Sequence, residues 1–316
     1  MRVPTAHRAL GVIAALALAT GLAGCTNAAD WSASGSDTAS SSSSANEGYD
    51  TSAIKEQADI AALLPKDALA DGVLDIGTST AYPPGEFLDA DGTPIGYEVD
   101  LTHAIARVLG VKTTTHSAAF DSIISSIGSK YDLGVAAMTI TTERESAVDM
   151  ISYINVGSQF DVQSGNPKKI DPSHTMNLCG LTIGVQTGTG QETELGTDSQ
   201  KCQAAGRKAI QVRSYSKHSE AATALVGGTI DATYSDSTVA GYAAQLTNGQ
   251  VETIGDVLDA LPQGIAVSKD DPQLTKAVQA AVQYLMDEGI WRDILSSWGV
   301  KDAALSKAEL NPSVGG

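Results

Sequence analysis

The chain has 316 residues, of which 42% are hydrophobic and 18% are charged, so it is long enough to bury the cores of about two domains. Its formal net charge of −17 argues against binding to nucleic acid, or to an anionic membrane surface, through charge. The five histidines show no metal-ligand spacing, and we expect neither a metal nor a cofactor.

The first 24 residues have the layout of a secretory signal peptide. Arg2 and Arg8 give a basic start, an apolar run too short and too alanine-rich to span a bilayer follows, and small residues precede a cysteine. The sequence Leu-Ala-Gly-Cys at residues 22–25 resembles the lipobox of bacterial lipoproteins. That resemblance implies an exported protein whose Cys25 is lipidated, anchored to the outer face of the cell membrane or the periplasmic side of an envelope membrane. The alternative is an ordinary secretory signal with a cysteine nearby.

Residues 25–48 are expected to form the lipidated cysteine and a serine-rich tether. Five successive serines at 40–44, among other small and polar residues, cannot contribute to a core. Such a composition is typical of a flexible linker, which would let the folded part move above the membrane.

The chain has three cysteines, an awkward number for an exported protein. With Cys25 assigned to lipid, Cys179 and Cys202 remain as a pair in an oxidising compartment. We expect a disulfide between them, which would contribute roughly 3 kcal/mol to stability by the chain-entropy argument. Two free thiols are the alternative.

From about residue 52 the hydrophobic pattern alternates between strands and helices. We expect, in order, a strand at 73–78, a helix over 100–111 that ends at Gly110, a helical stripe at 120–127 and a strand over 133–141. Further units follow: a strand at 182–186 and a helix from about Gln191, a helix at 219–225 and a strand at 230–234, and a strand at 264–267 before a long helix from Pro272. This alternation predicts an α/β architecture with largely parallel central sheets.

Seven short blocks occur along residues 50–300 in one order: GTSTAYPP (77–84), GYEVDL (96–101), FDSIISS (120–126), YDLGVAAMTITTER (131–144), GVQTGTGQ (184–191), DATYSD (231–236) and GIAVSKDD (264–271). In these blocks the chain resembles the periplasmic solute-binding proteins of polar amino acid ABC importers, bacterial extracellular solute-binding protein family 3. The resemblance implies a two-lobed periplasmic-binding-protein-like fold of type II, in which each lobe is a central β-sheet flanked by helices and two crossover strands join the lobes. Lobe I is expected at 49–157 plus 259–303, lobe II at 163–252, and a C-terminal tail at 304–316.

The same resemblance implies a function. The protein would be the extracytoplasmic substrate-binding component of an ABC importer and not an enzyme, with a free L-amino acid and the transmembrane subunits of the permease as partners. We expect a monomer that reaches the membrane through its lipid anchor only and does not bind nucleic acid.

A free amino acid carries a carboxylate and an ammonium, and burying both requires opposite charges or several hydrogen bonds. Arg144 follows a predicted strand, where the carboxyl end of the strand opens into the usual ligand crevice of α/β proteins. The resemblance implies that Arg144 clasps the α-carboxylate with its planar fork and that Thr139 donates to the same group. The carboxylate site would be completed by N–H groups at a helix start, from Thr189, Gly190 and Gln191. The alternative for Arg144 is a surface ion pair with a neighbouring glutamate.

The resemblance assigns the α-ammonium to Asp236 and to the backbone carbonyl of Ala137. The alternative for Asp236 is an N-cap of the helix that follows it. Tyr82 and Phe120 would sandwich the ligand side chain, unless they are ordinary core residues. Selectivity is expected from Ser79, Gln186 and Ser235; none carries a charge, which favours a neutral, polar side chain.

Two other functions compete with transport. A sensor or adaptor would use the same closed state and pass the signal to a receptor. A dehydratase-type enzyme on the same fold is less favoured, because the sequence has no nucleophile elbow and the predicted disulfide removes a thiol nucleophile.

Overall fold

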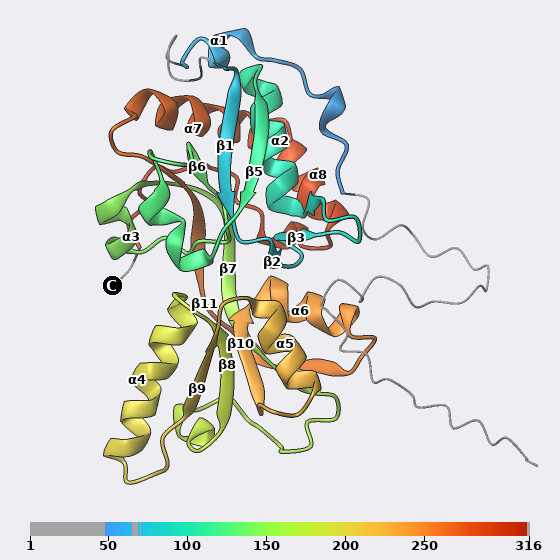
Figure 1. Ribbon diagram of the computed structural model, residues 1–316, viewed down its shortest axis with the longest axis vertical. Coiled ribbons are helices and arrows are strands. Elements are labelled where there is room, and N and C mark those ends of the chain that lie inside the picture. Colours follow the sequence, from blue (N-terminus) through green and yellow to red (C-terminus); the bar gives the residue numbers. More distant parts are fainter. Residues whose placement is uncertain (1–47, 65–68, 70, 315–316) are drawn as a thin grey trace, which may run out of the picture.

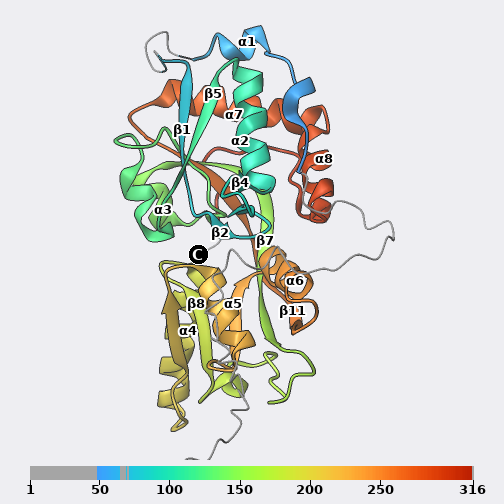
Figure 2. The same cartoon turned by 45° about the vertical axis from the view of Figure 1, so that its right-hand side comes forward.

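The structure of the protein is a computed structural model that describes residues 48–64, 69 and 71–314. The predicted signal peptide, Cys25 and nearly all of the tether therefore lie outside the described residues. The described chain forms two α/β lobes, joined by the long strands β7 (Asp149–Gln163) and β11 (Val251–Val267), which pass from one lobe into the other (Figures 1 and 2). This arrangement confirms the predicted two-lobed fold with two crossover strands.

Lobe I, at the top of Figure 1, combines the N-terminal part of the chain with the C-terminal helices. Its strands are β1 (Val73–Thr78), β2 (Ala81–Tyr82), β3 (Glu86–Leu88), β4 (Pro94–Ile95), β5 (Lys112–Ser117) and β6 (Leu133–Gly134). Its helices are α1 (Ala58–Ala61), α2 (Tyr97–Leu109), α3 (Thr142–Ala147), α7 (Pro272–Asp287) and α8 (Ile290–Ser297), with 3₁₀ turns η2 (Thr51–Ala53), η3 (Phe120–Ser122), η4 (Ile124–Ser126) and η6 (Lys301–Ala303).

Lobe II, at the bottom of Figure 1, comes from the middle of the chain. Its strands are β8 (Thr182–Gln186), β9 (Gln211–Tyr215) and β10 (Ala232–Asp236). Its helices are α4 (Gly190–Ala204), α5 (His218–Val226) and α6 (Ser237–Leu246), with the 3₁₀ turn η5 (Thr175–Leu178).

One eight-stranded sheet runs through both lobes in the order β5-β1-β6-β11-β7-β10-β8-β9. The pairs within each lobe, β1 with β5 and β6, and β8 with β9 and β10, are parallel. The crossover strands pair antiparallel with each other and with their neighbours, because β11 returns to lobe I in the direction opposite to β7. The expectation of largely parallel sheets is therefore correct within each lobe and wrong at the crossover. Strands β2, β3 and β4 form a separate antiparallel sheet.

Helix α2 shows how the sequence fixes one element of lobe I. Its apolar stripe packs into the core, where Leu101 and Ile105 are fully buried beside Trp291 of α8. The helix ends at Gly110, which caps it at φ 70°, a left-handed conformation that glycine adopts without a Cβ penalty. The predicted end of this helix is confirmed.

Two predicted elements were wrong: the helical stripe at 120–127 and the strand over 133–141. Residues 120–127 form the short 3₁₀ turns η3 and η4 and no regular helix. The strand predicted over 133–141 is regular only at Leu133–Gly134, with one isolated bridge at Thr139. Ala137 interrupts it with φ 49°, a conformation that no strand contains.

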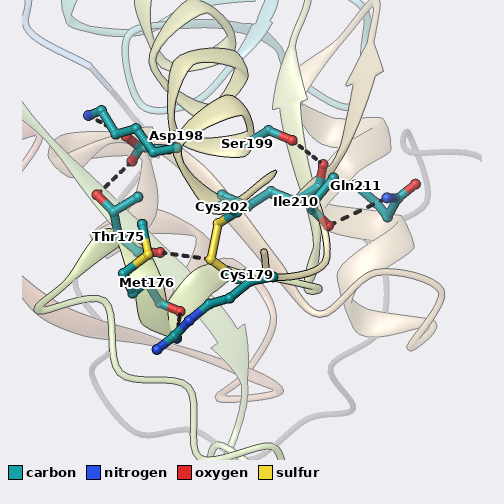
Figure 3. The surroundings of a disulfide bond; sticks show 11 residues. Thr175, Met176, Cys179, Asp198, Ser199, Cys202, Ile210 and Gln211 are labelled. Carbon is teal, nitrogen blue, oxygen red and sulfur yellow. Dashed lines mark hydrogen bonds and ion pairs between the residues drawn. A yellow bond between two sulfur atoms is a disulfide. The ribbon is translucent and has the colours of Figure 1, made fainter. Parts of the chain in front are cut away.

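The predicted disulfide joins Cys179 and Cys202, whose Cα atoms lie 5.6 Å apart (Figure 3). It ties the segment after η5 to the last turns of α4 and belongs to the hydrophobic core of lobe II. A second tie lies nearby, since Thr175 Oγ1 donates to Asp198 Oδ2 of α4 at 3.1 Å.

We propose the lobe boundaries given by the sequence, 49–157 plus 259–303 and 163–252. Separate hydrophobic cores support this division, one around α2, α7 and α8 and another around β8, α4 and β10. Residues 304–314 lie against β7, where the N–H of Asn311 donates to the carbonyl of Met150 at 2.8 Å, so the tail adds to lobe I. Every helix of the described ranges is too short or too polar to traverse a bilayer.

Candidate functional site

A small cavity that is partly open to solvent lies between the lobes. It is lined by Tyr82, Phe120, Ala136, Ala137, Thr139 and Arg144 of lobe I and by Gln186, Thr189, Gly190, Gln191 and Asp236 of lobe II. All residues predicted to contact the ligand are in this lining except Ser79 and Ser235. Ser79 lies directly behind it, where its Oγ accepts a hydrogen bond from Gln186 Nε2 at 3.1 Å. Sequence reasoning missed Ala136, for which the only signal was its place beside Ala137.

The topology explains why these residues meet. Gln186 is the last residue of β8 and Asp236 the last of β10, and the two strands are parallel neighbours. Ser79 and Tyr82 follow the carboxyl end of β1 in the other lobe. Because carboxyl ends of parallel strands are where α/β sheets place their ligand crevice, both lobes present such ends to one space.

Arg144 stands in the first turns of α3, whose N-cap Thr141 accepts from the Arg144 N–H at 3.2 Å. Its guanidinium donates from Nη1 to the carbonyl of Thr139 at 2.7 Å and from Nη2 to the carbonyl of Gly188 at 3.3 Å. The group also lies over the Phe120 ring, with Cζ 5.3 Å from the ring centroid. Burial lowers the pKa of Arg144, while Asp236 opposes that shift. Within the described chain Arg144 forms no ion pair with a neighbouring glutamate, so that alternative is not what the fold uses.

Helix α4 begins at the cavity. Its N-cap is Thr189, whose Oγ1 accepts from the N–H of Glu192 at 3.3 Å. The first N–H groups of a helix have no acceptor inside it, and here they belong to Gly190 and Gln191, which line the cavity. A carboxylate at this point would meet free N–H donors and the positive end of the helix dipole.

Asp236 is only 5% exposed and faces Arg144 across the cavity lining. Its Oδ1 accepts from Gln191 Nε2 at 2.8 Å and its Oδ2 accepts from Gln263 Nε2 at 2.6 Å. Burial raises the pKa of Asp236 to about 6, against the two amide hydrogen bonds, which lower it. Asp236 occupies the N-cap position of α6, but its side chain accepts no bond from that helix. The carboxylate is thus directed into the site and held by uncharged donors.

Two rings flank the lining. Phe120 lies under the Arg144 guanidinium, and Tyr82 packs edge-on against His218, with ring centroids 5.4 Å apart. Tyr82 Oη also accepts from the backbone N–H of Asp236 at 3.2 Å, which links the two lobes. Sequence reasoning missed His218, whose burial lowers its pKa to about 4 and keeps its ring neutral.

Gln186 contributes an uncharged side chain to the lining. Gln186 uses its Nε2 to donate to Ser79 and, at 3.4 Å, to the carbonyl of Ser216. Its Oε1 is left as an acceptor without a donor in the described chain. Ser235 is buried outside the lining, and its Oγ has no partner among the described residues. The described ranges hold no group of three or more histidine, cysteine or acidic side chains arranged to bind a metal ion.

Comparison with known proteins places this geometry in a family. The profile of the bacterial extracellular solute-binding proteins, family 3, matches residues 74–301. The arginine-binding protein ArgT of Corynebacterium glutamicum is 36% identical over 255 residues, which cover 80% of this chain and 83% of that protein. Two solved structures of an ancestral arginine-binding protein also match. The one bound to arginine has a TM-score of 0.65 at 33% identity and covers 72% of this chain and 98% of that chain. The one bound to glutamine has a TM-score of 0.64 at 34% identity and covers 72% and 97%.

Proposed function

The chain belongs to the bacterial extracellular solute-binding proteins of family 3, and from that premise we propose that it captures a free L-amino acid and delivers it to the permease of an ABC importer. The observation that carries the proposal is the placement of a half-buried cation, Arg144, and a buried acid, Asp236, on one cavity between two lobes. That pair matches the two charges that every free α-amino acid presents.

The two ends of the ligand would be held by different partners. Its carboxylate would accept from the guanidinium of Arg144 in lobe I and from the N–H groups of Gly190 and Gln191 in lobe II. Its ammonium would donate to Asp236 in lobe II and to the carbonyl of Ala137 in lobe I. Because each charge is shared between the lobes, the ligand binds the closed arrangement best and stabilises it.

The ligand side chain would extend toward Ser79 and Gln186. These groups are uncharged, which favours a neutral polar side chain, whereas the relative from Corynebacterium glutamicum is named for arginine. Glutamine and arginine share terminal N–H donors, and Gln186 Oε1 is an acceptor on the lining. We therefore propose a side chain that ends in N–H groups, with L-glutamine and L-arginine as the first candidates.

The test is a binding screen against the free amino acids by thermal shift, with calorimetry on each hit, after unfolding and refolding to remove carried-over ligand. A ligand at a hundredfold excess over its Kd stabilises the native state by about 2.7 kcal/mol, which raises the melting temperature. Arg144→Ala and Asp236→Ala should abolish the shift, and Arg292→Ala, which removes an exposed cation of α8, should not. No response to any amino acid would contradict the proposal.

Transport and sensing separate in cells. Deleting the gene should abolish high-affinity uptake of the bound amino acid, and the wild-type gene should restore uptake where the Arg144→Ala gene does not. Unchanged uptake in the deletion strain, with binding intact in vitro, would favour the sensor or adaptor role. Conversion of the bound amino acid by the purified protein would instead indicate an enzyme.

We also propose that the protein is exported, lipidated at Cys25 and monomeric. Support for the anchor is the signal-like segment at residues 1–24 that ends in the lipobox. Cys25→Ser should move the protein from the membrane fraction to the soluble fraction and abolish labelling with a palmitate analogue, whereas Thr26→Ser should change neither. Sedimentation of the soluble variant should give one species at the mass of a single chain.

A further inference from the structure

Ala137 has an unusual backbone for a residue with a side chain. Its φ of 49° lies in the left-handed region, which costs free energy for any residue but glycine. It is 7% exposed and lines the cavity, and its carbonyl accepts no hydrogen bond from any described residue. Strained backbone at a binding site persists only where neighbouring groups hold it in place.

The neighbour that holds Ala137 is Glu98, the second residue of α2. Its Oε1 accepts from the backbone N–H of Ala137 at 2.8 Å and also from the hydroxyl of Tyr153 on β7. Glu98 is 1% exposed, so these two contacts replace solvent around its Oε1 atom. A carboxylate accepting from a buried N–H is a strong, short contact, and here it fixes the peptide group between Ala136 and Ala137 and thereby the backbone at Ala137.

A second carboxyl, Glu86 of β3, lies beside Glu98 and is fully buried. Burial raises the pKa of Glu86 well above its usual range, and the nearby Glu98 raises it further. Burial also raises the pKa of Glu98, but the contacts from Glu86, Tyr153 and Ala137 oppose that shift. Two like charges disfavour double ionisation, so Glu86, whose pKa is raised well above its usual range, is the carboxyl that keeps its proton.

The other titratable groups around the pair are the hydroxyls of Tyr82, Tyr97 and Tyr153 and, across the cavity, the carboxylate of Asp236. None of these groups is a cation. A ligand ammonium at Ala137 would add a positive charge beside these carboxyls.

We propose that Glu98 is a positioning residue of the binding site, which holds the N–H of Ala137 so that the Ala137 carbonyl faces the cavity and receives the α-ammonium of the ligand. This inference rests on the proposed function, since it needs an amino acid in the cavity. If the inference is right, Glu98 determines how strongly the protein prefers an α-amino acid over the same acid without its amino group, although Glu98 lies outside the cavity lining.

The experiment compares two pairs of probes by calorimetry: L-arginine with 5-guanidinopentanoate, and L-glutamine with 4-carbamoylbutanoate. Each pair differs only in the α-ammonium. Glu98→Gln removes the charge, and Glu98→Met removes the acceptor as well. We expect both to reduce the preference for the amino acid, Glu98→Met by about tenfold or more. The matched control is Glu86→Gln, which replaces a neutral carboxyl and should leave the preference within about twofold.

A second readout needs no ligand. The Ala137 amide proton, bonded to a carboxylate, should resonate downfield in the NMR spectrum, move upfield in Glu98→Met and stay in place in Glu86→Gln. If the wild-type protein binds L-arginine or L-glutamine while neither Glu98 variant changes the preference or the resonance, the inference fails and the proposed function stands. If the wild-type protein binds no amino acid, both the proposed function and this inference are contradicted.

Discussion

Asp236 is held in its ionised form by neighbours that carry no charge. Gln191 and Gln263 each donate one amide hydrogen bond to it, and burial still leaves its pKa at about 6. An ammonium in the cavity would add a positive charge in direct contact with the carboxylate. Binding at this residue should therefore depend on pH in the range where few other groups of the site titrate.

We predict that affinity for an amino acid decreases below pH 6. Binding needs the Asp236 carboxylate, and the ammonium of the ligand lowers the pKa of that group. Below pH 6 a proton therefore competes with the ligand, and the affinity should decrease about tenfold for each pH unit. Calorimetry between pH 5 and 8 should show this slope for the wild type and a weak, pH-independent affinity for Asp236→Asn. Asp231→Asn, at the opposite end of β10, is the control that should keep the wild-type slope. The same slope in Asp236→Asn would show that another group titrates.

Asp161 of β7 gives a prediction about stability. It is 1% exposed, and burial raises its pKa to about 8, a shift that the side chain of Thr233 on the paired strand β10 opposes. A pKa raised above the unfolded value of about 3.9 means that the folded state holds a proton that the unfolded state loses. The contribution of protonated Asp161 to the free energy of unfolding is therefore fully present below pH 4 and is lost as the pH rises through 8.

Asp161→Asn should therefore be more stable than the wild type at pH 8, on the order of 5 kcal/mol, and the difference should shrink toward pH 4. Urea unfolding of the ligand-free protein at pH 4.5 and pH 8 would measure it. The exposed Asp256→Asn is the matched control and should change neither value. An equal effect of Asp161→Asn at both pH values would mean that Asp161 is ionised in the folded protein.

At the scale of elements, the disulfide between Cys179 and Cys202 stabilises lobe II. It connects residues 23 positions apart, and both sulfurs lie in the lobe II core. Replacing both cysteines by alanine should cost roughly 3 kcal/mol and lower the melting temperature by about 5–10 °C. The Kd for the amino acid should stay nearly constant, because α4 meets the cavity at Gly190, at the other end of the helix. Reductant should lower the melting temperature of the wild type and leave the variant unchanged; equal melting temperatures would contradict the prediction.

An element can be predicted from the sequence when local residues determine its conformation, and not when contacts distant in the sequence do. Strands β1 and β8 were predicted with their observed ends, because continuous burial and flanking turn residues define them locally. Residues 133–141 read as a strand because they are apolar, but beyond Gly134 their backbone turns to the cavity and relies on Glu98, far away in sequence. The lining was found through resemblance to a family. Its supports, Glu86, Glu98 and Gln263, were missed because their contacts exist only in the folded chain.

At the scale of the whole molecule, the lobes touch through contacts on opposite sides of the cavity. Gln186 of lobe II donates to Ser79, Arg144 donates to the carbonyl of Gly188, and the N–H of Asp236 donates to Tyr82. All depend on one angle between the lobes, which the two crossover strands set. A change in the packing of β7 against β11 should therefore alter binding without touching the cavity.

Gly157 of β7 is where that packing is tightest. A Cβ added there would lie 2.4 Å from Val257 Cγ1 and 2.5 Å from the backbone oxygen of Leu258 on β11, so the strands must move apart. We predict that Gly157→Ala weakens amino acid binding at least tenfold, a loss that a displacement of about 1 Å at the site can produce by misaligning the charged contacts.

Calorimetry would measure the binding loss, and small-angle scattering would show a larger radius of gyration that ligand no longer reduces. The matched control is Gly196→Ala in the middle of α4, where an added Cβ meets nothing within 4 Å. It should keep the wild-type Kd and stabilise the protein by about 0.5–1 kcal/mol, the usual gain of alanine over glycine in a helix. Wild-type affinity and compaction in Gly157→Ala would mean that the crossover absorbs the extra methyl group locally, and that the angle between the lobes is set elsewhere.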